Sequence, residues 1–194
     1  MRRKDRERDR AFAYDVIDRC EYGVAAMAGE GGAPYCVPLS LVRLGDTLYF
    51  HCALEGTKLD CLRRSPRVCV SFVASNQAAL DKFTTYFQSA NVIGTAAEVT
   101  EEAEKISALR ALCEKLTPAN MAGDNFDRAI AKSLPRTGVW RIRMEEVTGK
   151  EKPRPLFVWK EIVPCPLIVS LPACGSGSPP PGGRPFWPVL SPAI

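Results

Sequence analysis

Most of the chain before Gly149 consists of short segments in which apolar and polar residues alternate, separated by turn-forming residues. Alternation with a period of two predicts strands that bury one face, because successive side chains of a strand point to opposite sides. Short consecutive antiparallel strands favour a barrel or a sandwich, so the predicted fold class is mainly β with a few helices. We expect strands over 22–28, 34–43, 46–53, 67–74, 82–88, 90–99 and 138–147, with hairpin turns at 29–32 and 44–46.

Helical spacing of apolar residues appears in three places, and it predicts helices over 9–20, 101–116 and 127–134. Thr100 is expected to cap the second helix, whose first turn is rich in glutamate and therefore suits the helix dipole. The third helix should end before Pro135, because the residue preceding a proline avoids the helical conformation.

The only histidine of the chain, His51, lies on a predicted strand that is followed by a helix start. Thr57 is expected to cap this helix, with Asp60 three residues later, and Lys58 adds a cation. Free N–H groups and the helix dipole stabilise an anion at such a place, so this segment is a candidate phosphate site. An ordinary cap, a solvated Lys58 and a hydrogen-bonded, half-buried His51 are the alternative interpretation.

The net charge of +4 is not evidence for nucleic-acid binding, because it belongs to the two ends of the chain. Residues 1–10 carry +3 and residues 153–194 carry +2, which leaves the body at −1. Acids alternate with bases in the N-terminal arm, which indicates a solvated segment. No segment has the composition of a signal peptide or of a membrane span, so we expect neither nucleic acid nor a membrane as partner.

Eight cysteines raise the question of a disulfide framework or a metal site. The chain has no Cys-x-x-Cys pair, and one histidine cannot complete a zinc cluster of the usual spacing. Most of the cysteines lie within apolar patterns, where a free thiol behaves as a small hydrophobic group. We therefore expect reduced thiols, no metal and a cytoplasmic location.

The composition changes abruptly after Lys152. Residues 153–194 contain eleven of the sixteen prolines and a run of Gly, Ser and Pro at 175–183. Such a segment can neither pair as a central strand nor continue a helix. We expect one domain over 1–152, followed by a Pro/Gly-rich, disordered tail over 153–194.

Five motifs in this order resemble the pyridoxamine 5′-phosphate oxidase-related, FMN-binding split-barrel proteins, and among them the 5-nitroimidazole-resistance (Nim-type) group. The motifs are Tyr22-Gly-Val-Ala-Ala-Met27, the segment from Gly31 to Val42, the segment from Tyr49 to Lys58, Lys82-Phe-Thr-Thr-Tyr-Phe-Gln-Ser89, and Pro135-Arg-Thr-Gly-Val-Trp-Arg-Ile142. The resemblance implies an antiparallel FMN-binding split β-barrel. It also implies a homodimer that completes two cofactor sites at its interface.

The resemblance further implies which residues meet the flavin. The main chain of Val37, Pro38, Leu39 and Ser40 would lie along the isoalloxazine ring. His51, Cys52, Ala53 and Lys58 match the region of the ribityl chain and phosphate. Thr84, Thr85 and Ser89 match hydroxyl positions near the cofactor, although threonine is common in strands. His51 corresponds to the histidine associated with the active site, where it would donate a proton to the substrate.

Trp140 allows two interpretations, a filler of the core or a wall for a planar ring. Three classes of function remain open. The first is an FMN-dependent reductase that uses NAD(P)H on nitroaromatic or related small molecules. The second is a split barrel that binds haem or another cofactor, and the third is a flavin-binding protein without turnover.

Overall fold

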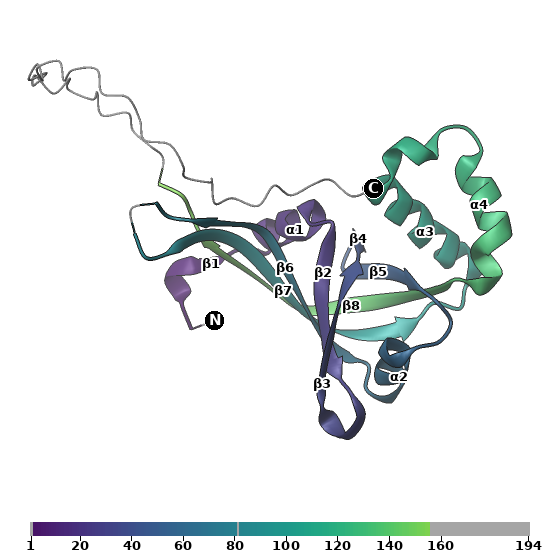
Figure 1. Ribbon diagram of the computed structural model, residues 1–194, viewed down its shortest axis with the longest axis horizontal. Coiled ribbons are helices and arrows are strands. Elements are labelled where there is room, and N and C mark those ends of the chain that lie inside the picture. The colour runs from purple at the N-terminus through teal and green to yellow at the C-terminus, as the bar shows by residue number, and fades with distance from the viewer. Residues whose placement is uncertain (1, 81, 156–194) are drawn as a thin grey trace, which may run out of the picture. The chain divides into compact units, whose positions relative to one another are not determined.

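The computed structural model describes residues 2–80 and 82–155, which form one curled antiparallel sheet with four helices (Figure 1). The strands are β1 (Glu7–Arg8), β2 (Tyr22–Ala28), β3 (Pro34–Ser40), β4 (Val42–Leu44), β5 (Thr47–Cys52), β6 (Arg67–Ala78), β7 (Thr85–Glu98) and β8 (Gly138–Lys152). The helices are α1 (Arg10–Arg19), α2 (Thr57–Arg64), α3 (Glu102–Leu116) and α4 (Asn125–Ser133). Short 3₁₀ turns cover Lys4–Arg6, Glu30–Gly32, Pro118–Met121 and Leu134–Arg136.

The order of strands shows how the sheet curls. It runs β3-β2-β6-β7-β8-β5-β4, with β1 paired to β8. The two ends of this order, β3 and β4, are separated in the chain by the single residue Leu41, which is buried. The sheet must therefore bend until its edges approach each other, and β3 lies near β5 without pairing to it. This half-barrel is the architecture expected of a split barrel.

The alternating pattern predicted most strands to within a few residues, and 22–28 is a strand over its whole predicted length. Three predictions were wrong. The predicted strand 34–43 is divided at Leu41 into β3 and β4, which lie at opposite ends of the strand order because the chain crosses there from one edge of the sheet to the other. In place of the two predicted strands 82–88 and 90–99 there is one strand, Thr85–Glu98, because Ser89 pairs with Val73 on one side and with Lys150 on the other and so continues both ladders. Thr100 does not cap α3, because Glu101 occupies the N-cap position and makes no side-chain cap hydrogen bond.

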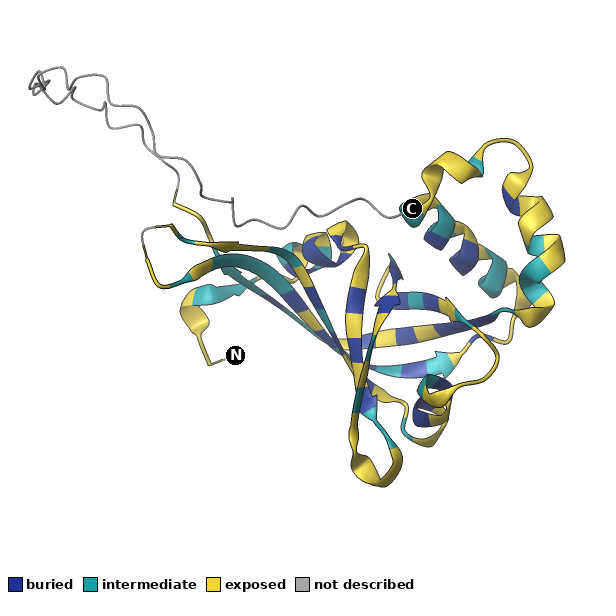
Figure 2. Ribbon diagram, in the orientation of Figure 1, coloured by how far each residue is buried: buried dark blue, intermediate teal, exposed yellow. Residues whose placement is uncertain are grey.

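The main core lies between the concave face of the sheet and the helices α1 and α2 (Figure 2). Burial alternates along the strands, as their period of two requires. Gly149 allows α1 to approach β8, because a Cβ atom at this position would lie 2.9 Å from the Phe12 ring. The largest fully buried side chains of this core are Val16, Ile17, Leu41, Leu48, Phe50, Leu59, Leu62, Val70, Phe72, Val92 and Ile142.

A second, smaller core lies where α3 and α4 pack on the other face of β5 and β8. It contains Val42, Val99, Ala108, Leu109, Leu112, Phe126 and Val139. A polar contact fixes α3 on the sheet. Glu104 accepts a hydrogen bond from the Tyr49 hydroxyl at 3.0 Å and from Arg141 at 2.8 and 2.9 Å. Burial and the neighbouring Glu104 raise the pKa of Tyr49, so its hydroxyl stays protonated.

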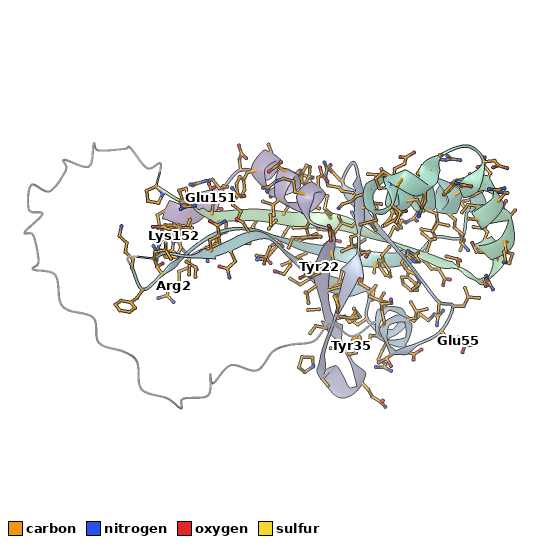
Figure 3. All side chains as sticks on the ribbon, turned by 45° about the horizontal axis from the view of Figure 1, so that its top comes forward. Arg2, Tyr22, Tyr35, Glu55, Glu151 and Lys152 are labelled. Atoms are coloured by element: carbon orange, nitrogen blue, oxygen red, sulfur yellow. The ribbon has the colours of Figure 1, made fainter. Side chains whose placement is uncertain are left out.

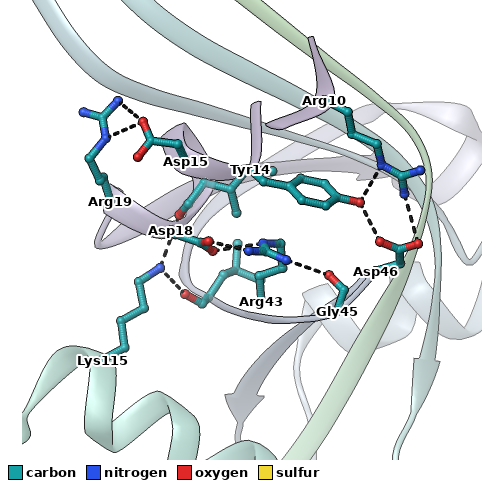
Figure 4. A network of polar contacts seen from close by, with 11 residues as sticks. Arg10, Tyr14, Asp15, Asp18, Arg19, Arg43, Gly45, Asp46 and Lys115 are labelled. Atoms are coloured by element: carbon teal, nitrogen blue, oxygen red, sulfur yellow. Dashed lines mark hydrogen bonds and ion pairs between the residues drawn. The ribbon is translucent and has the colours of Figure 1, made fainter. Parts of the chain in front are cut away.

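A polar network joins α1 to the β4–β5 turn (Figure 4). Arg10 donates to the Tyr14 hydroxyl at 2.7 Å, and this hydroxyl donates to Asp46 at 2.6 Å. Arg43 stacks on the Tyr14 ring with its Cζ atom 4.3 Å from the ring centre, and its guanidinium binds Asp18 in a bidentate fashion. The network therefore holds α1 against β4 and the β4–β5 turn.

No helix within residues 2–80 and 82–155 is both long and apolar enough to cross a membrane. The six cysteines in these segments are all free thiols. The predicted tail over 153–194 falls, from residue 156 onward, outside the described residues.

A chain truncated after Lys152 is expected to keep its melting temperature to within about 2 °C, which corresponds to a change of less than ~1 kcal/mol for a domain of this size. The reason is that every described helix and strand ends at or before Lys152. Thermal unfolding followed by circular dichroism on both chains tests this expectation. Aggregation of the shorter chain, or a clear drop in its melting temperature, would show that the tail is part of the fold.

Candidate functional site

The turn between β5 and α2 leaves a helix N-terminus without a side-chain cap. Gly56 occupies the N-cap position with φ 130°, a conformation that a residue with a side chain rarely adopts. Its carbonyl accepts from the N–H groups of Leu59 at 2.8 Å and Asp60 at 3.2 Å. The N–H groups of Thr57 and Lys58 meet no acceptor in the described part of the chain. The prediction that Thr57 caps this helix was wrong, because Thr57 is already its first residue.

Lys58 adds a full positive charge to this helix start. Its Nζ atom lies 5.3 Å from the centre of the Phe50 ring, at a distance that permits a cation–π contact. No carboxylate among the described residues forms an ion pair with it. A helix dipole, free backbone donors and an unpaired ammonium group together make an anion site, and a phosphate has the charge and the acceptors for all of them.

His51 lies next to this turn, on the outer face of β5 and opposite Val139 of β8. Its side chain is exposed, whereas the preceding Phe50 is buried in the core. Partial desolvation, and after it the charge of Lys58, lower the pKa of His51 below its usual 6.5. The imidazole is therefore mainly neutral at pH 7, with one ring nitrogen as a donor and the other as an acceptor.

A proton titration of His51 is expected to have its midpoint below 6.5, because the folded protein disfavours the imidazolium form. The unfolded chain then binds this proton more tightly, so the contribution of His51 to stability falls as the pH drops below about 6.5. NMR of the imidazole Cε1–H signal measures the midpoint without ambiguity, because the chain has one histidine. Lys58→Ala should raise it, and an unchanged midpoint would show that Lys58 does not act on the imidazole.

Cys52 and Ala53 follow His51 at the end of β5. Cys52 packs against the main core, and burial raises the pKa of its thiol, so it is not a reactive thiolate. Gly138 lies opposite Cys52 in β8, where a Cβ atom would be 3.1 Å from the Ala53 carbonyl oxygen and 3.3 Å from the Cys52 Sγ atom. Gly56 and Gly138 thus shape this turn.

The segment Val37–Ser40 lies on β3, the edge strand that approaches β5. Val37 and Leu39 point toward the core, and Pro38 and Ser40 are exposed. As an edge strand, β3 has backbone groups that no neighbouring strand uses, and Pro38 has no N–H to leave unpaired. The structure therefore places this segment on an open sheet edge near β5.

Thr84, Thr85 and Ser89 are not brought to this turn. Ser89 pairs with Lys150, and Lys150 is 11 residues along β8 from Val139, the partner of His51. At about 3.3 Å per residue, this separation is roughly 36 Å. The three hydroxyl residues lie instead toward the far end of the β6–β7 hairpin (Figure 1). Within one copy of the chain they cannot share a ligand of nucleotide size with Lys58.

Trp140 fills the core. Its side chain is 3% exposed and packs in the main cluster opposite Phe50. Its ring face is therefore covered by protein, and the interpretation as a wall for a cofactor does not hold for this structure. The indole N–H has no hydrogen-bond partner among the described residues. In the same part of the chain, no three His, Cys, Asp or Glu side chains gather in a way that could hold a metal ion.

Comparison with known proteins assigns the chain to a family. A family model for pyridoxamine 5′-phosphate oxidase matches residues 9–151. The match covers most of the chain, so the chain belongs to the pyridoxamine 5′-phosphate oxidase family. No curated protein matches it. The matched range spans α1 to β8 and includes the β5–α2 turn.

Solved structures share the fold. A candidate 5-nitroimidazole antibiotic resistance protein from Bacteroides thetaiotaomicron VPI-5482 is 23% identical, with a TM-score of 0.63 over 74% of this chain and 84% of its own. The flavocytochrome of Azotobacter vinelandii is 21% identical, with a TM-score of 0.66 over 98% and 91%. A FAD and haem binding protein from Mycobacterium smegmatis is 20% identical, with a TM-score of 0.61 over 75% and 72%. These likenesses confirm the predicted antiparallel split barrel.

Proposed function

We propose that this protein is a flavin-dependent oxidoreductase that uses FMN and NAD(P)H to reduce nitroaromatic compounds, 5-nitroimidazoles among them, or related small molecules. The observation that carries the proposal is the uncapped start of α2, with the free N–H groups of Thr57 and Lys58 and an ammonium group that has no carboxylate partner within residues 2–80 and 82–155. This donor set fits the phosphate of a flavin nucleotide. The family and the flavin-binding proteins of the same fold support it.

The residues around the β5–α2 turn have different proposed roles. Lys58 and the α2 N-terminus bind the phosphate, and the β5–α2 turn from Cys52 onward follows the ribityl chain. The edge strand β3, at Val37–Ser40, offers backbone groups to the polar edge of the ring. His51 holds a proton beside the substrate oxygen. When bound, the flavin supplies the hydride chemistry that these side chains lack.

We propose that the protein is a homodimer. The outer faces of β2 and β6 expose apolar side chains that a monomer would leave in water, with Tyr22 and Val73 each 59% exposed. Tyr22 is labelled in Figure 3. A second copy on this face would cover them. It would also bring its own Thr84, Thr85 and Ser89 toward the first copy's β5–α2 turn. Within one copy these residues are too far from that turn to share a ligand with it. We place the dimer in the cytoplasm, where free thiols stay reduced.

Haem binding is the second candidate function. It is favoured by one observation, an exposed histidine whose lowered pKa keeps the imidazole neutral and able to ligate iron. The fold is shared with a protein that binds both FAD and haem. The two candidates differ in what His51→Ala removes. A haem protein would lose its Soret absorption, whereas a flavoprotein would keep its flavin absorption.

The decisive experiment is the absorption spectrum and mass of the ligand that purifies with the full chain. We expect a yellow protein that carries FMN and oxidises NAD(P)H when a nitroimidazole is added. Flavin without any such turnover would indicate a flavin-binding protein with a storage or sensing role. A chain that purifies without flavin and binds none when FMN is added would contradict the proposed function.

A further inference from the structure

Lys115, near the end of α3, is half-buried and lies outside the candidate site (Figure 4). Its Nζ atom donates hydrogen bonds to two backbone carbonyl oxygens, that of Leu41 at 2.9 Å and that of Ile17 at 3.3 Å. Both of these residues are 1% exposed and belong to the main core. A lysine of α3, a helix that packs in the second core, therefore reaches the backbone of the first.

The positions of Ile17 and Leu41 in the chain explain why their carbonyl groups accept from a side chain. Ile17 lies in the last turn of α1, where carbonyl groups have no partner within the helix. Leu41 is the single residue between β3 and β4 and belongs to neither strand. No N–H group of a turn or loop in the described segments donates to either oxygen. Lys115 thus satisfies two buried acceptors, and its charge suits the negative end of the α1 dipole.

The surroundings of Lys115 are unfavourable for a cation. Burial is the main influence on this side chain, and it lowers the pKa of the ammonium group. No carboxylate of residues 2–80 and 82–155 forms an ion pair with Lys115, and the carboxylate of Asp18 binds Arg43. Lysines at a surface usually keep the ammonium group in water. The contact with the two carbonyl groups therefore holds Lys115 in place against its own hydration.

Leu41 is the point at which the two edges of the sheet are joined. β3 pairs with β2 over its whole length, and β4 pairs with β5 from Val42, opposite Tyr49, onward. β3 and β5 approach each other but share no ladder of hydrogen bonds. The distance between these two strands is therefore governed by the backbone at Leu41, and the Leu41 carbonyl is bound by Lys115.

The helix that carries Lys115 is itself fixed to β5. Glu104, in the first turn of α3, accepts a hydrogen bond from Tyr49 of β5 at 3.0 Å. Lys115 lies near the other end of α3, roughly 16 Å further along the helix axis. A single rigid helix thus contacts β5 through Glu104 and the β3–β4 junction through Lys115.

We propose that Lys115 is a positioning residue that fixes the gap between β3 and β5 through the Leu41 carbonyl, and thereby the position of the flavin ring relative to its phosphate site. The inference rests on the proposed function, in which Val37–Ser40 of β3 meets the ring and the turn after β5 binds the phosphate. Lys115 itself contacts no part of the cofactor in this proposal. Its loss leaves the donors of the α2 N-terminus in place and loosens the end of β3.

The first test is hydrogen–deuterium exchange of the full chain, measured by mass spectrometry on peptides that cover residues 37–46. The variant K115M removes the donor and keeps a long apolar side chain, and exchange in these peptides should become about fivefold faster or more. The matched control R110M removes a cation from the same helix, where Arg110 binds Asp127 of α4 at 2.9 Å and stacks on Phe126. Exchange over 37–46 should stay unchanged in R110M.

The second test is titration with FMN at a temperature at which every variant is folded. K115M should bind FMN about tenfold more weakly than the wild type. K115R keeps a cationic donor and should restore most of the affinity, and R110M should bind FMN as the wild type does. A lysine with a purely structural role would lower the melting temperature and leave both the FMN affinity and the visible spectrum of the bound flavin unchanged.

Three results would overturn the inference: unchanged exchange over 37–46 in K115M, unchanged FMN affinity in K115M despite faster exchange, or an equal loss of FMN affinity in R110M. If K115M does not fold, K115Q, which keeps an uncharged N–H donor, takes its place in both tests. A wild-type chain that binds no flavin would contradict the proposed function. The exchange experiment would then still decide whether Lys115 holds the β3–β4 junction.

Discussion

Replacing His51 with alanine is expected to lower NAD(P)H-driven turnover by about 10²-fold or more while the protein still folds and binds FMN. The reason is that a positioned proton donor contributes about 10²- to 10⁴-fold to a reaction that protonates its substrate. His51 is exposed on the outer face of β5, so its loss removes no core contact. Steady-state rates at saturating NAD(P)H, with flavin content measured for each sample, test the expectation.

The pH profile separates a proton donor from a cofactor clamp. Because the pKa of His51 is lowered, the wild-type rate should rise as the pH falls from 7 toward that pKa, and the profile of His51→Ala should be flat. Tyr49→Phe is the matched control, since Tyr49 shares the outer face of β5 and contacts Glu104 of α3. If His51→Ala loses FMN, yet its reconstituted fraction works at the wild-type rate, His51 holds the cofactor and the proton comes from water.

Lys58→Ala is expected to weaken FMN binding by about ten- to a hundred-fold, which corresponds to roughly 1.5–3 kcal/mol for one charge-assisted contact. The physical reason is that Lys58 supplies a cation, unpaired by any carboxylate of the described segments, next to the free N–H groups of the α2 N-terminus. The backbone donors and the helix dipole remain in the variant, so binding should weaken rather than vanish. Fluorescence titration of the apo-protein with FMN measures the change.

Arg64→Ala is the matched control for this prediction, because it removes one positive charge from the opposite end of the same helix. Its FMN affinity should stay within about twofold of the wild type, since Arg64 lies at the far end of α2 and a charge about one Debye length (about 10 Å) away acts only weakly through solvent. An unchanged affinity in Lys58→Ala would remove Lys58 from the cofactor site. Equal losses in both variants would point to net charge instead of a contact.

The alternating sequence pattern predicted where the strands lie more accurately than it predicted how long they are. The segment 22–28 alternates without interruption, and it is a strand over that range. The predicted strands 82–88 and 90–99 left a break at Ser89, but the strand continues because both neighbouring strands pair with this residue. Ladder hydrogen bonds from two partners stabilise a strand through a polar residue, and a single sequence does not show which partners are present.

Capping illustrates the same limit. Thr57 and Thr100 are both good capping residues by type, yet neither caps its helix. At α2 the N-cap residue is Gly56, with φ 130°, and not Thr57. The helix therefore begins at Thr57, one residue earlier than predicted, and the N–H groups of its first residues stay free. The free N–H donors of the candidate site therefore result from the backbone conformation of Gly56, which is defined only in the folded turn.

The sequence by itself determined the family, the alternating strands, and the placement of one histidine and one lysine on either side of a glycine turn. These are local properties, carried by neighbouring residues and their periods. The tertiary structure decided that Trp140 points into the core, that Thr84, Thr85 and Ser89 lie far from Lys58 within one copy, and that Arg6 and Lys150 both approach the Phe87 ring. Alternation distinguishes two faces of a strand but does not say which face is inside, or what lies across it, because register and sheet curvature are set by contacts between residues distant in the chain.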